Sequence, residues 1–491
     1  MIKSFRNITA ILIALFAVAF VSCKNDDICD LKFPIEAAFV GDWGESTTLK
    51  FTYRNAAKLE VRTITGGWKA EVDKATRTLT VTAPESETAE EADRVGTIHV
   101  VAVAEGGDSE GAIIYGYIVD GNIDLSANGS QSNCYVITQP NTKYRFNARV
   151  KGNSTETIPT AKIGVVWCEE PTDVRYLSLD DDGYASFFVS YDNGSNGEAL
   201  TTAPKGNTII AAYDSAGTIL WSWHIWLTGD KDPREGFELS NGATLMDFNL
   251  GAWSNPEAAT GDVAIWEGYG LYYQWGRKDP FLRPEYYDCA MNTDQTVYDA
   301  DEEYVYVTMK ATTEKIGTVE YSVKHPVTFI TSTEENQGNW LYQNNRNDLW
   351  SASGKKSMYD PCPNGWRVPA KSIFDVLDIA AADDALPLDV AEKQFGWYLT
   401  DKGNGETHFF PASGYRSYYN GVISNVNYRD EYPYTPKPWV GYYWTAGAGS
   451  AAATSTAMYF DLNTSRATIN GFKAMTDQKR GNAMQVRCVK E

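Results

Sequence analysis

The stretch "DPCPNGWRVP", residues Asp360–Pro369, places Cys362 between two prolines and follows it with a Gly-Trp pair. A cysteine in this setting can be a nucleophile, a metal ligand or half of a disulfide. Proline fixes φ and removes a backbone donor, so the segment is expected to be a stiff connection. Which of these roles Cys362 has therefore decides whether the chain is better read as an enzyme or as a binding protein.

A helix is predicted directly after this stretch, over residues 370–386. Ile373, Phe374 and Leu377 recur at the spacing that places them on one helix face, as expected for a helix packed on a sheet. Pro387 ends the pattern.

Composition narrows the classes of protein. The chain has 491 residues, so two to four domains are expected. Its formal net charge of −21 argues against a nucleic-acid ligand, because too little positive charge is present to neutralise phosphates. Aromatic residues reach 13%, and such residues are common both in cores and at binding surfaces.

The N-terminus has the pattern of a targeting signal. Two basic residues precede an apolar run over residues 11–21 that is short for a membrane span. The run ends in Ser22-Cys23, which resembles a bacterial lipobox, so residues 1–22 are expected to be a signal peptide and Cys23 the lipidated residue. Residues 23–30 form the tether, and its "KNDD" resembles the tag that sends lipoproteins of gut Bacteroidetes-type bacteria to the outer face. An outer-membrane location, facing the exterior, is therefore expected.

Two β-rich segments follow the tether. Residues 31–120 contain short β-branched and aromatic runs between turn clusters, which favours an Ig-like sandwich and weakly resembles BACON-type domains. Residues 121–229 form a second predicted β-sandwich, in which residues 206–229 read as a hairpin around an Asp-Ser-Ala-Gly turn. The "DDDG" at Asp180–Gly183 is either tight-turn chemistry or a calcium site, and the turn is favoured.

Residues 230–491 carry the most distinctive motifs. In order these are "GATLMDFNLGAW" (242–253), "YGLYYQWGRKDPF" (269–281), "LYQNNRNDLW" (341–350), "YDPCPNGWRVP" (359–369), "FPASGYR" (410–416), "GYYWTA" (441–446) and "VRCVKE" (486–491). This series resembles the FISUMP domain family of fibre-degrading gut bacteria and covers about half of the chain. "SNCYVI" (132–137) and "ILWSWHIW" (219–226) resemble the β-domain that often precedes it.

The resemblance implies a fold and a use for the cysteines. The FISUMP family is thought to share the C-type-lectin-like fold of formylglycine-generating enzymes, which gives a mainly β chain with two Ig-like sandwiches and a C-terminal α+β module. In that fold the C-terminal strand returns to the core sheet, so a Cys362–Cys488 disulfide is the simplest use of both residues. Six cysteines remain if Cys23 is lipidated, and they allow 15 pairings, so the pairing of Cys29, Cys134, Cys168 and Cys289 stays open. Phe248 stands where the family often has Arg, which is expected to alter a surface contact.

No catalytic arrangement stands out. His99, His224, His325 and His408 lie far apart in the sequence and outside any recognisable motif. No nucleophile elbow, zinc motif or phosphate loop is present. The sequence therefore predicts a non-enzyme with no cofactor and no metal.

Binding has better support. Residues 415–443 read "YRSYYNGVISNVNYRDEYPYTPKPWVGYY", in which aromatic rings alternate with amides and charged groups, and the prolines suggest a long loop. Such rings can stack on sugar faces, or they can pack the segment as a self-supporting Ω-loop. The candidate ligand-binding residues are Tyr415, Arg416, Tyr419, Trp439, Tyr442 and Tyr443.

These observations predict a lipid-anchored surface protein for adhesion or for recognition of a glycan or a host or matrix protein. Two alternatives remain: a glycan-capture accessory or enzyme-like protein, and a structural envelope or fimbrial-tip subunit in a pilus or surface complex. The ligand and the oligomeric state are not determined by the sequence.

Overall fold

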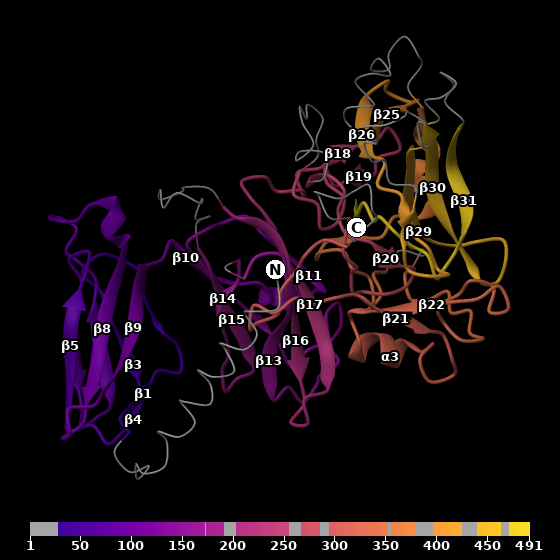
Figure 1. Ribbon diagram of the computed structural model, residues 1–491. Helices are drawn as coiled ribbons and strands as arrows, with labels where there is room; N and C mark the ends of the chain where they lie inside the picture. Colours follow the sequence, from indigo (N-terminus) through magenta and orange to yellow (C-terminus); the bar gives the residue numbers. More distant parts are fainter. Residues whose placement is uncertain are drawn as a thin grey trace, which may run out of the picture. The chain divides into compact units, whose positions relative to one another are not determined.

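The computed structural model describes residues 28–171, 173–190, 203–254, 267–284, 294–351, 355–379, 396–424, 439–462 and 471–491. It divides into two compact units, residues 1–121 and 122–491. Both are mainly β in the part described (Figure 1). Cys23 and the predicted signal peptide lie outside the described residues.

The first unit is built from two principal sheets. One has the order β2-β9-β8-β5 and the other β3-β7-β6, with a small β1-β4 pair beside them. The strands are β1 (Asp30–Lys32), β2 (Ala37–Val40), β3 (Ser46–Lys50), β4 (Thr52–Arg54), β5 (Lys58–Ile64), β6 (Lys69–Asp73), β7 (Thr78–Thr82), β8 (Val95–Val103) and β9 (Ser109–Ile118).

Trp68 lies at the centre of the first unit's core. A Cβ at Gly96 would lie 2.3 Å from the Trp68 ring, and one at Gly116 would lie 2.7 Å from it. The two glycines on adjacent strands therefore make the space that the indole fills, and its Nε1 donates to the Asp93 carbonyl at 2.9 Å. A side chain at either glycine would force the ring out of the core.

The second unit begins with a β-sandwich. One sheet has the order β10-β12-β15-β14 and the other β11-β17-β16-β13. The strands are β10 (Gly121–Asp124), β11 (Cys134–Ile137), β12 (Thr142–Asn147), β13 (Lys162–Cys168), β14 (Arg175–Leu179), β15 (Tyr184–Val189), β16 (Lys205–Tyr213) and β17 (Ile219–Thr228). The predicted hairpin is confirmed, because β16 and β17 pair antiparallel around residues 214–218.

Strand β17 is buried on both faces from Trp221 to Thr228. Trp221, Trp223 and Ile225 fill the sandwich core, whereas Trp226 on the opposite face packs into the core of the C-terminal region. A strand covered on both sides needs a nearly continuous apolar run, which explains "ILWSWHIW". Within the second unit, the sandwich and residues 230–491 share one core across the predicted boundary at residues 229/230.

The C-terminal region consists of several small sheets. Their orders are β18-β19-β33-β23, β20-β32-β27-β28, β24-β25-β26, β29-β30-β31 and β21-β22. The strands are β18 (Phe237–Glu238), β19 (Thr244–Leu245), β20 (Tyr273–Gln274), β21 (Thr308–Ala311), β22 (Thr328–Thr331), β23 (Trp366–Arg367), β24 (Leu377–Ile379), β25 (Gly396–Asp401), β26 (Thr407–Pro411), β27 (Tyr415–Arg416), β28 (Ile423–Ser424), β29 (Trp439–Ala448), β30 (Thr454–Leu462), β31 (Gly471–Lys479), β32 (Ala483–Met484) and β33 (Val489–Lys490). Helix α3 (Val319–Lys324) lies in the same region.

The helix predicted over residues 370–386 is wrong where the structure describes that segment. Lys371–Val376 form a single 3₁₀ segment, and Leu377–Ile379 then become strand β24, in which Leu377 pairs with Asp401 of β25. Ala370 supplies no side-chain cap, so the first turn has no such support. Pairing with β25 satisfies the backbone of residues 377–379, and tertiary context overrides the helical pattern. Residues 380–386 lie outside the described part.

Candidate recognition site and the stapled loop

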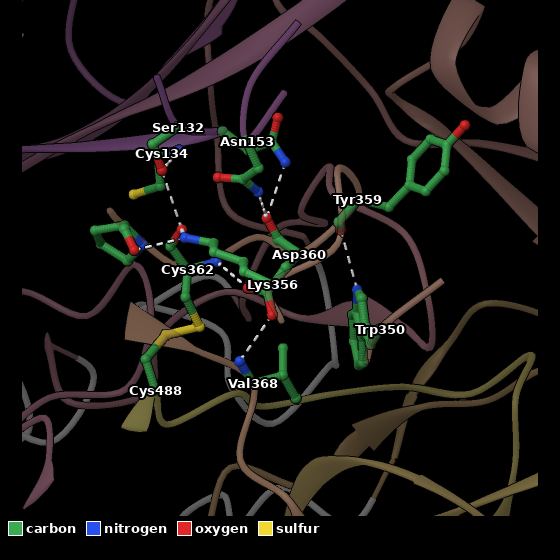
Figure 2. The surroundings of a disulfide bond; sticks show 12 residues. Ser132, Cys134, Asn153, Trp350, Lys356, Tyr359, Asp360, Cys362, Val368 and Cys488 are labelled. Atoms are coloured by element: carbon green, nitrogen blue, oxygen red, sulfur yellow. Dashed lines mark hydrogen bonds between the residues drawn. A yellow bond between two sulfur atoms is a disulfide. The ribbon is translucent and has the colours of Figure 1, made fainter. Parts of the chain in front are cut away.

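The predicted disulfide between Cys362 and Cys488 is present (Figure 2). Both residues are fully buried and lie 126 positions apart in the chain. The C-terminal strand β33 pairs with β23 through Arg367 and Val489, so the disulfide and the strand pairing hold the same two segments together. Cys29, Cys134 and Cys168 are buried thiols, and Cys289 lies outside the described residues.

A buried carboxyl group and a half-buried ammonium group shape the loop around Cys362. The Asp360 carboxylate accepts hydrogen bonds from the backbone N–H of Cys362 and of Val368, both at 2.9 Å. Lys356 Nζ donates to the carbonyls of Cys362 and Pro363, the second at 2.6 Å. Burial raises the pKa of Asp360 and lowers that of Lys356, and each of the two charges opposes the shift of the other. Every contact described for this pair holds the loop backbone, so the pair is structural.

The loop is also held by the preceding sandwich (Figure 2). Asn133 Nδ2 donates to the carbonyls of Met358 and Asp360, both at 2.8 Å. Asn133 Oδ1 accepts from Trp221 Nε1 at 3.0 Å, and Ser132 Oγ donates to the Cys362 carbonyl at 3.2 Å. The "SNC" and "DPCP" motifs are therefore the two halves of one contact.

Buried ion pairs extend this joint between the sandwich and the C-terminal region. Glu169 at the end of β13 accepts from Arg283 Nη2 at 2.9 Å and from Trp253 Nε1 at 2.8 Å. Lys278 and Asp279 form a second buried pair, in which Asp279 accepts from Ser222 Oγ on β17 at 2.6 Å. The "GRKDPF" motif thus supplies charges to the joint rather than to an open cleft.

The four histidines occupy separate elements. His224 on β17 is buried with Nε2 2.7 Å from Asn207 Oδ1, and burial lowers its pKa to about 3. The His408 ring stacks on Phe237 at 3.8 Å between centroids, and the His325 ring lies 4.1 Å from that of Tyr321. His99 lies on β8 of the first unit. These contacts give three of the rings packing roles.

The "DDDG" segment forms a turn between β14 and β15, as favoured from the sequence. Asp180 Oδ1 accepts from Tyr184 N at 2.7 Å, and Gly183 has a φ of 86°. A positive φ of this size favours glycine, which explains the residue at that position. Within the described residues, no group of three or more acidic, histidine or cysteine side chains could hold a metal ion.

Two of the candidate ligand-binding residues are buried, which corrects that assignment. Tyr443 is fully buried, and its hydroxyl donates to the Pro411 carbonyl at 2.6 Å. Arg416 is 1% exposed, and it donates to the Leu282 carbonyl through Nε and Nη2 and to the Gly421 carbonyl through Nη1. Neither side chain reaches a surface ligand, since Tyr443 is engaged by an internal carbonyl and Arg416 by internal carbonyls and by an ion pair with Asp294.

The motif residues near Tyr443 are internal as well. Asn249 accepts from Arg487 Nε at 3.0 Å and donates to the Tyr443 hydroxyl at 3.3 Å. Phe248 is 1% exposed and lies in the shared core. The expectation that Phe248 alters a surface contact is therefore wrong.

The remaining candidates differ in exposure. Tyr419 is 70% exposed at the tip of the turn between β27 and β28. Tyr415 and Tyr442 are half-buried, with their rings edge-to-face at 5.2 Å, and both pack against the shared core. The side chain of Trp439 lies outside the described residues.

The turn that carries Tyr419, residues 417–422, has a fixed backbone. Ser417 N donates to the Val422 carbonyl at 3.0 Å, and Gly421 N donates back to the Ser417 carbonyl at 2.8 Å. Arg416 ties this turn to the loop at Leu282 through the bonds described above. The arginine predicted as a ligand contact is instead the group that positions Tyr419.

Tyr304 and Tyr306 form an exposed aromatic pair that lies outside the motifs named above. Tyr304 and Tyr306 are 59% and 72% exposed, whereas Val305 and Val307 between and beyond them pack against the core. The strict alternation of tyrosine and valine over residues 304–307 predicts an extended segment with tyrosines on one face and valines on the other.

Comparisons with known proteins give little further information. No family model and no curated protein matches the chain. Solved structures that match in part include a protocadherin gamma C5 fragment (10% identity, TM-score 0.15, 42% of this chain and 68% of that one) and the Drosophila DLAR Ig1-2 module (12%, 0.14, 41% and 98%). The human desmocollin-1 ectodomain matches at 10% identity and a TM-score of 0.15, over 46% of this chain and 44% of that one. TM-scores this low carry no argument about function. No described helix has the length and apolar character needed to cross a membrane.

Proposed function

We propose that this chain is a lipid-anchored outer-surface protein of the FISUMP type, with a C-type-lectin-like C-terminal module, that recognises a glycan without catalysing its cleavage. The location rests on the lipobox-like sequence ending at Cys23, and the family on the ordered motifs of residues 242–491. The recognition role rests on the presentation of Tyr419.

Tyr419 combines exposure with a rigid support. Its side chain is 70% exposed, and the turn beneath it is fixed by backbone bonds and by the buried Arg416. Val422 and Met309 beside it are 45% and 41% exposed, and a Cβ at Gly421 would lie 2.4 Å from Met309 Sδ. A ring held in this way loses little conformational entropy on binding, and tyrosine can stack on a sugar face while its hydroxyl bonds to sugar hydroxyls.

The groups that resemble catalytic sets support a non-catalytic role. Cys362 is in a disulfide, Lys356 and Asp360 bond to loop backbone, and His224 is buried on β17. A catalytic acid or base must reach the substrate within hydrogen-bond distance. These four residues are engaged inside the fold.

The test is a glycan array probed with the full chain, followed by titration of any hit. Tyr419→Ala should weaken binding about tenfold, since aromatic stacking residues at binding sites contribute on the order of 1–2 kcal/mol. Tyr115→Ala is the control, because it removes an exposed tyrosine on β9 of the first unit and should leave the affinity unchanged.

Two results would contradict the proposal. Equal binding by Tyr419→Ala and the wild-type chain would remove the site, and release of sugars from a polysaccharide by the purified protein would remove the non-catalytic role. An array with no hit at all would favour a structural envelope or fimbrial-tip subunit instead.

A further inference from the structure

A cavity of about 440 Å³ lies in the second unit, where the sandwich meets the C-terminal region. Its lining comes from β13, the adjoining Pro171–Leu177 segment, β16 and the turn at residues 299–302. This volume falls in the range typical of small-ligand pockets. The cavity is separate from the turn that carries Tyr419, since the two share no residue.

The lining of this solvent-open cavity is mixed, with apolar side chains beside a somewhat larger polar surface. The apolar lining residues are Ile163, Val165, Pro171, Val174, Leu177 and the ring of Tyr213. A bound ligand with one aromatic ring would cover part of this apolar surface, and burying apolar surface favours binding.

The turn at residues 299–302 gives the cavity an acidic edge. Asp299, Asp301 and Glu302 line it, and Lys162 is the one basic lining residue. Lys162 Nζ lies 5.9 Å from the centroid of the Tyr213 ring on the opposite strand. Three carboxylates against one ammonium leave an excess of negative charge at the cavity.

The acidic turn is fixed to the sandwich. Tyr298 and Cys168 exchange two backbone hydrogen bonds, of 2.8 and 2.9 Å. Asp299 Oδ1 accepts from the backbone N–H of Asp301 at 2.9 Å and of Glu303 at 3.0 Å, which holds the turn in shape. The backbone that carries the three carboxylates is thus held in place before any ligand arrives.

Two buried groups at the cavity are consistent with a polar, negatively charged site. Thr208 is fully buried, lines the cavity, and its Oγ1 has no hydrogen-bond partner among the described residues. Burial and, after it, the surrounding carboxylates, Asp173 and Asp299 among them, together raise the pKa of the Cys168 thiol to about 12. The shift of the Cys168 pKa is therefore in the direction expected for a thiol close to several carboxylates.

We propose that this cavity binds a small organic cation with an apolar body, such as an aromatic amine. The apolar lining residues take the carbon skeleton, and Asp299, Asp301 and Glu302 face its ammonium group. This inference does not depend on the glycan-recognition role. A metal ion is a poorer fit, because these residues form no group that could hold one within the described part of the chain.

The test is titration of the full chain, in mild detergent, with phenethylamine followed by calorimetry or ligand-observed NMR. A ligand of this size in such a pocket should bind with a dissociation constant of about 1 mM or below. The uncharged analogue 2-phenylethanol should bind at least about tenfold more weakly, and raised salt should weaken only the amine.

Variants locate the site. Asp301→Asn with Glu302→Gln should weaken phenethylamine binding about tenfold, because both exposed carboxylates are removed. Asp181→Asn with Asp182→Asn is the matched control, since it removes two exposed carboxylates that do not line the cavity. Val165→Phe should block binding by filling the cavity, with unchanged thermal unfolding to show that the chain still folds.

Three results would overturn the proposal: no binding of phenethylamine at about 10 mM, equal binding of the amine and the alcohol, or unchanged binding by the Asp301/Glu302 variant.

Discussion

The buried Glu169–Arg283 pair offers the sharpest test of how the second unit is held together. Glu169 belongs to the sandwich, whereas Arg283 and Trp253 belong to the C-terminal region. Glu169 Oε1 accepts from Arg283 and from Asn207 Nδ2 at 3.0 Å, and Oε2 accepts from Trp253. Both oxygens of the Glu169 carboxylate therefore act as acceptors, and replacing either oxygen by a donor breaks at least one of these hydrogen bonds.

Glu169→Gln keeps the shape but replaces one acceptor with an NH₂ group. That group must face either the Trp253 N–H or the donors of Arg283 and Asn207, and the buried guanidinium loses its counter-charge. Removing one partner of a buried pair destabilises a fold by about 3–5 kcal/mol. With a urea m-value of about 3 kcal/mol/M, the unfolding midpoint should fall by about 1–1.7 M.

The assay is urea unfolding followed by tryptophan fluorescence, which reports mainly on the second unit because most tryptophans lie there. Glu156→Gln is the control. It breaks the exposed Lys151–Glu156 pair, which should change the free energy of unfolding by less than about 1 kcal/mol.

A double variant separates charge burial from packing. Glu169→Leu with Arg283→Met removes both charges, so no buried charge is left without a partner. Asn207 keeps its bond to the Gly251 carbonyl, so the main loss is the acceptor of the Trp253 N–H, at about 1–3 kcal/mol. The double variant should therefore destabilise the chain less than Glu169→Gln does. The reasoning fails if Glu169→Gln costs less than about 1 kcal/mol or if the double variant is the less stable of the two.

Three further predictions concern the same region. Replacing Cys362 and Cys488 together by Ser should destabilise the second unit by up to about 5 kcal/mol, which is the loop entropy of a closure of 126 residues. Non-reducing peptide mapping must first find the two cysteines linked, and free thiols at both positions would contradict the assignment. Asn133→Ala should lower the free energy of unfolding by about 3 kcal/mol, since it leaves two carbonyls and the Trp221 N–H without this partner, and a loss below about 1 kcal/mol in thermal or urea unfolding would argue against the joint. Burial lowers the pKa of His224 to about 3, so between about pH 6.5 and 3 the unfolded chain binds more protons at this site than the folded chain does. The free energy of unfolding should therefore fall on acidification by up to about 1.4 kcal/mol per pH unit from this residue. His224→Gln should flatten this slope in urea titrations at stepped pH, and parallel slopes for the variant and the wild-type chain would refute the prediction.

Several features of the fold follow from local sequence. The hairpin of β16 and β17 was predictable because a tight turn joins two β-rich runs, and the Asp180–Gly183 turn because its last residue needs a positive φ. The Cys362–Cys488 link came from a family resemblance, since six cysteines alone allow many pairings. The helix over residues 370–386 failed because strand pairing with β25 supplied a better use for the backbone of Leu377–Ile379 than a helix did.

At the candidate site, the exposure of individual side chains could not be predicted from the sequence. A tyrosine-rich segment can be recognised from composition, but not which rings face solvent: Tyr443 is in the core, Tyr415 and Tyr442 are half-buried, and Tyr419 is exposed. Arg416 is a charged residue of this segment, and only its bonds to residues distant in the chain reveal that it supports the turn beneath Tyr419.

The sequence by itself determined the β-rich class, the strongly acidic charge and the stiff Cys362 loop, because these depend on composition and on residues close together in the chain. Tertiary structure decided what the motifs are for. Asn133 and Asp360 meet, as do Glu169 and Arg283, from positions more than a hundred residues apart. Such contacts depend on how sheets pack, which no local pattern encodes, and they make the stretch "DPCPNGWRVP" part of a joint within one compact unit.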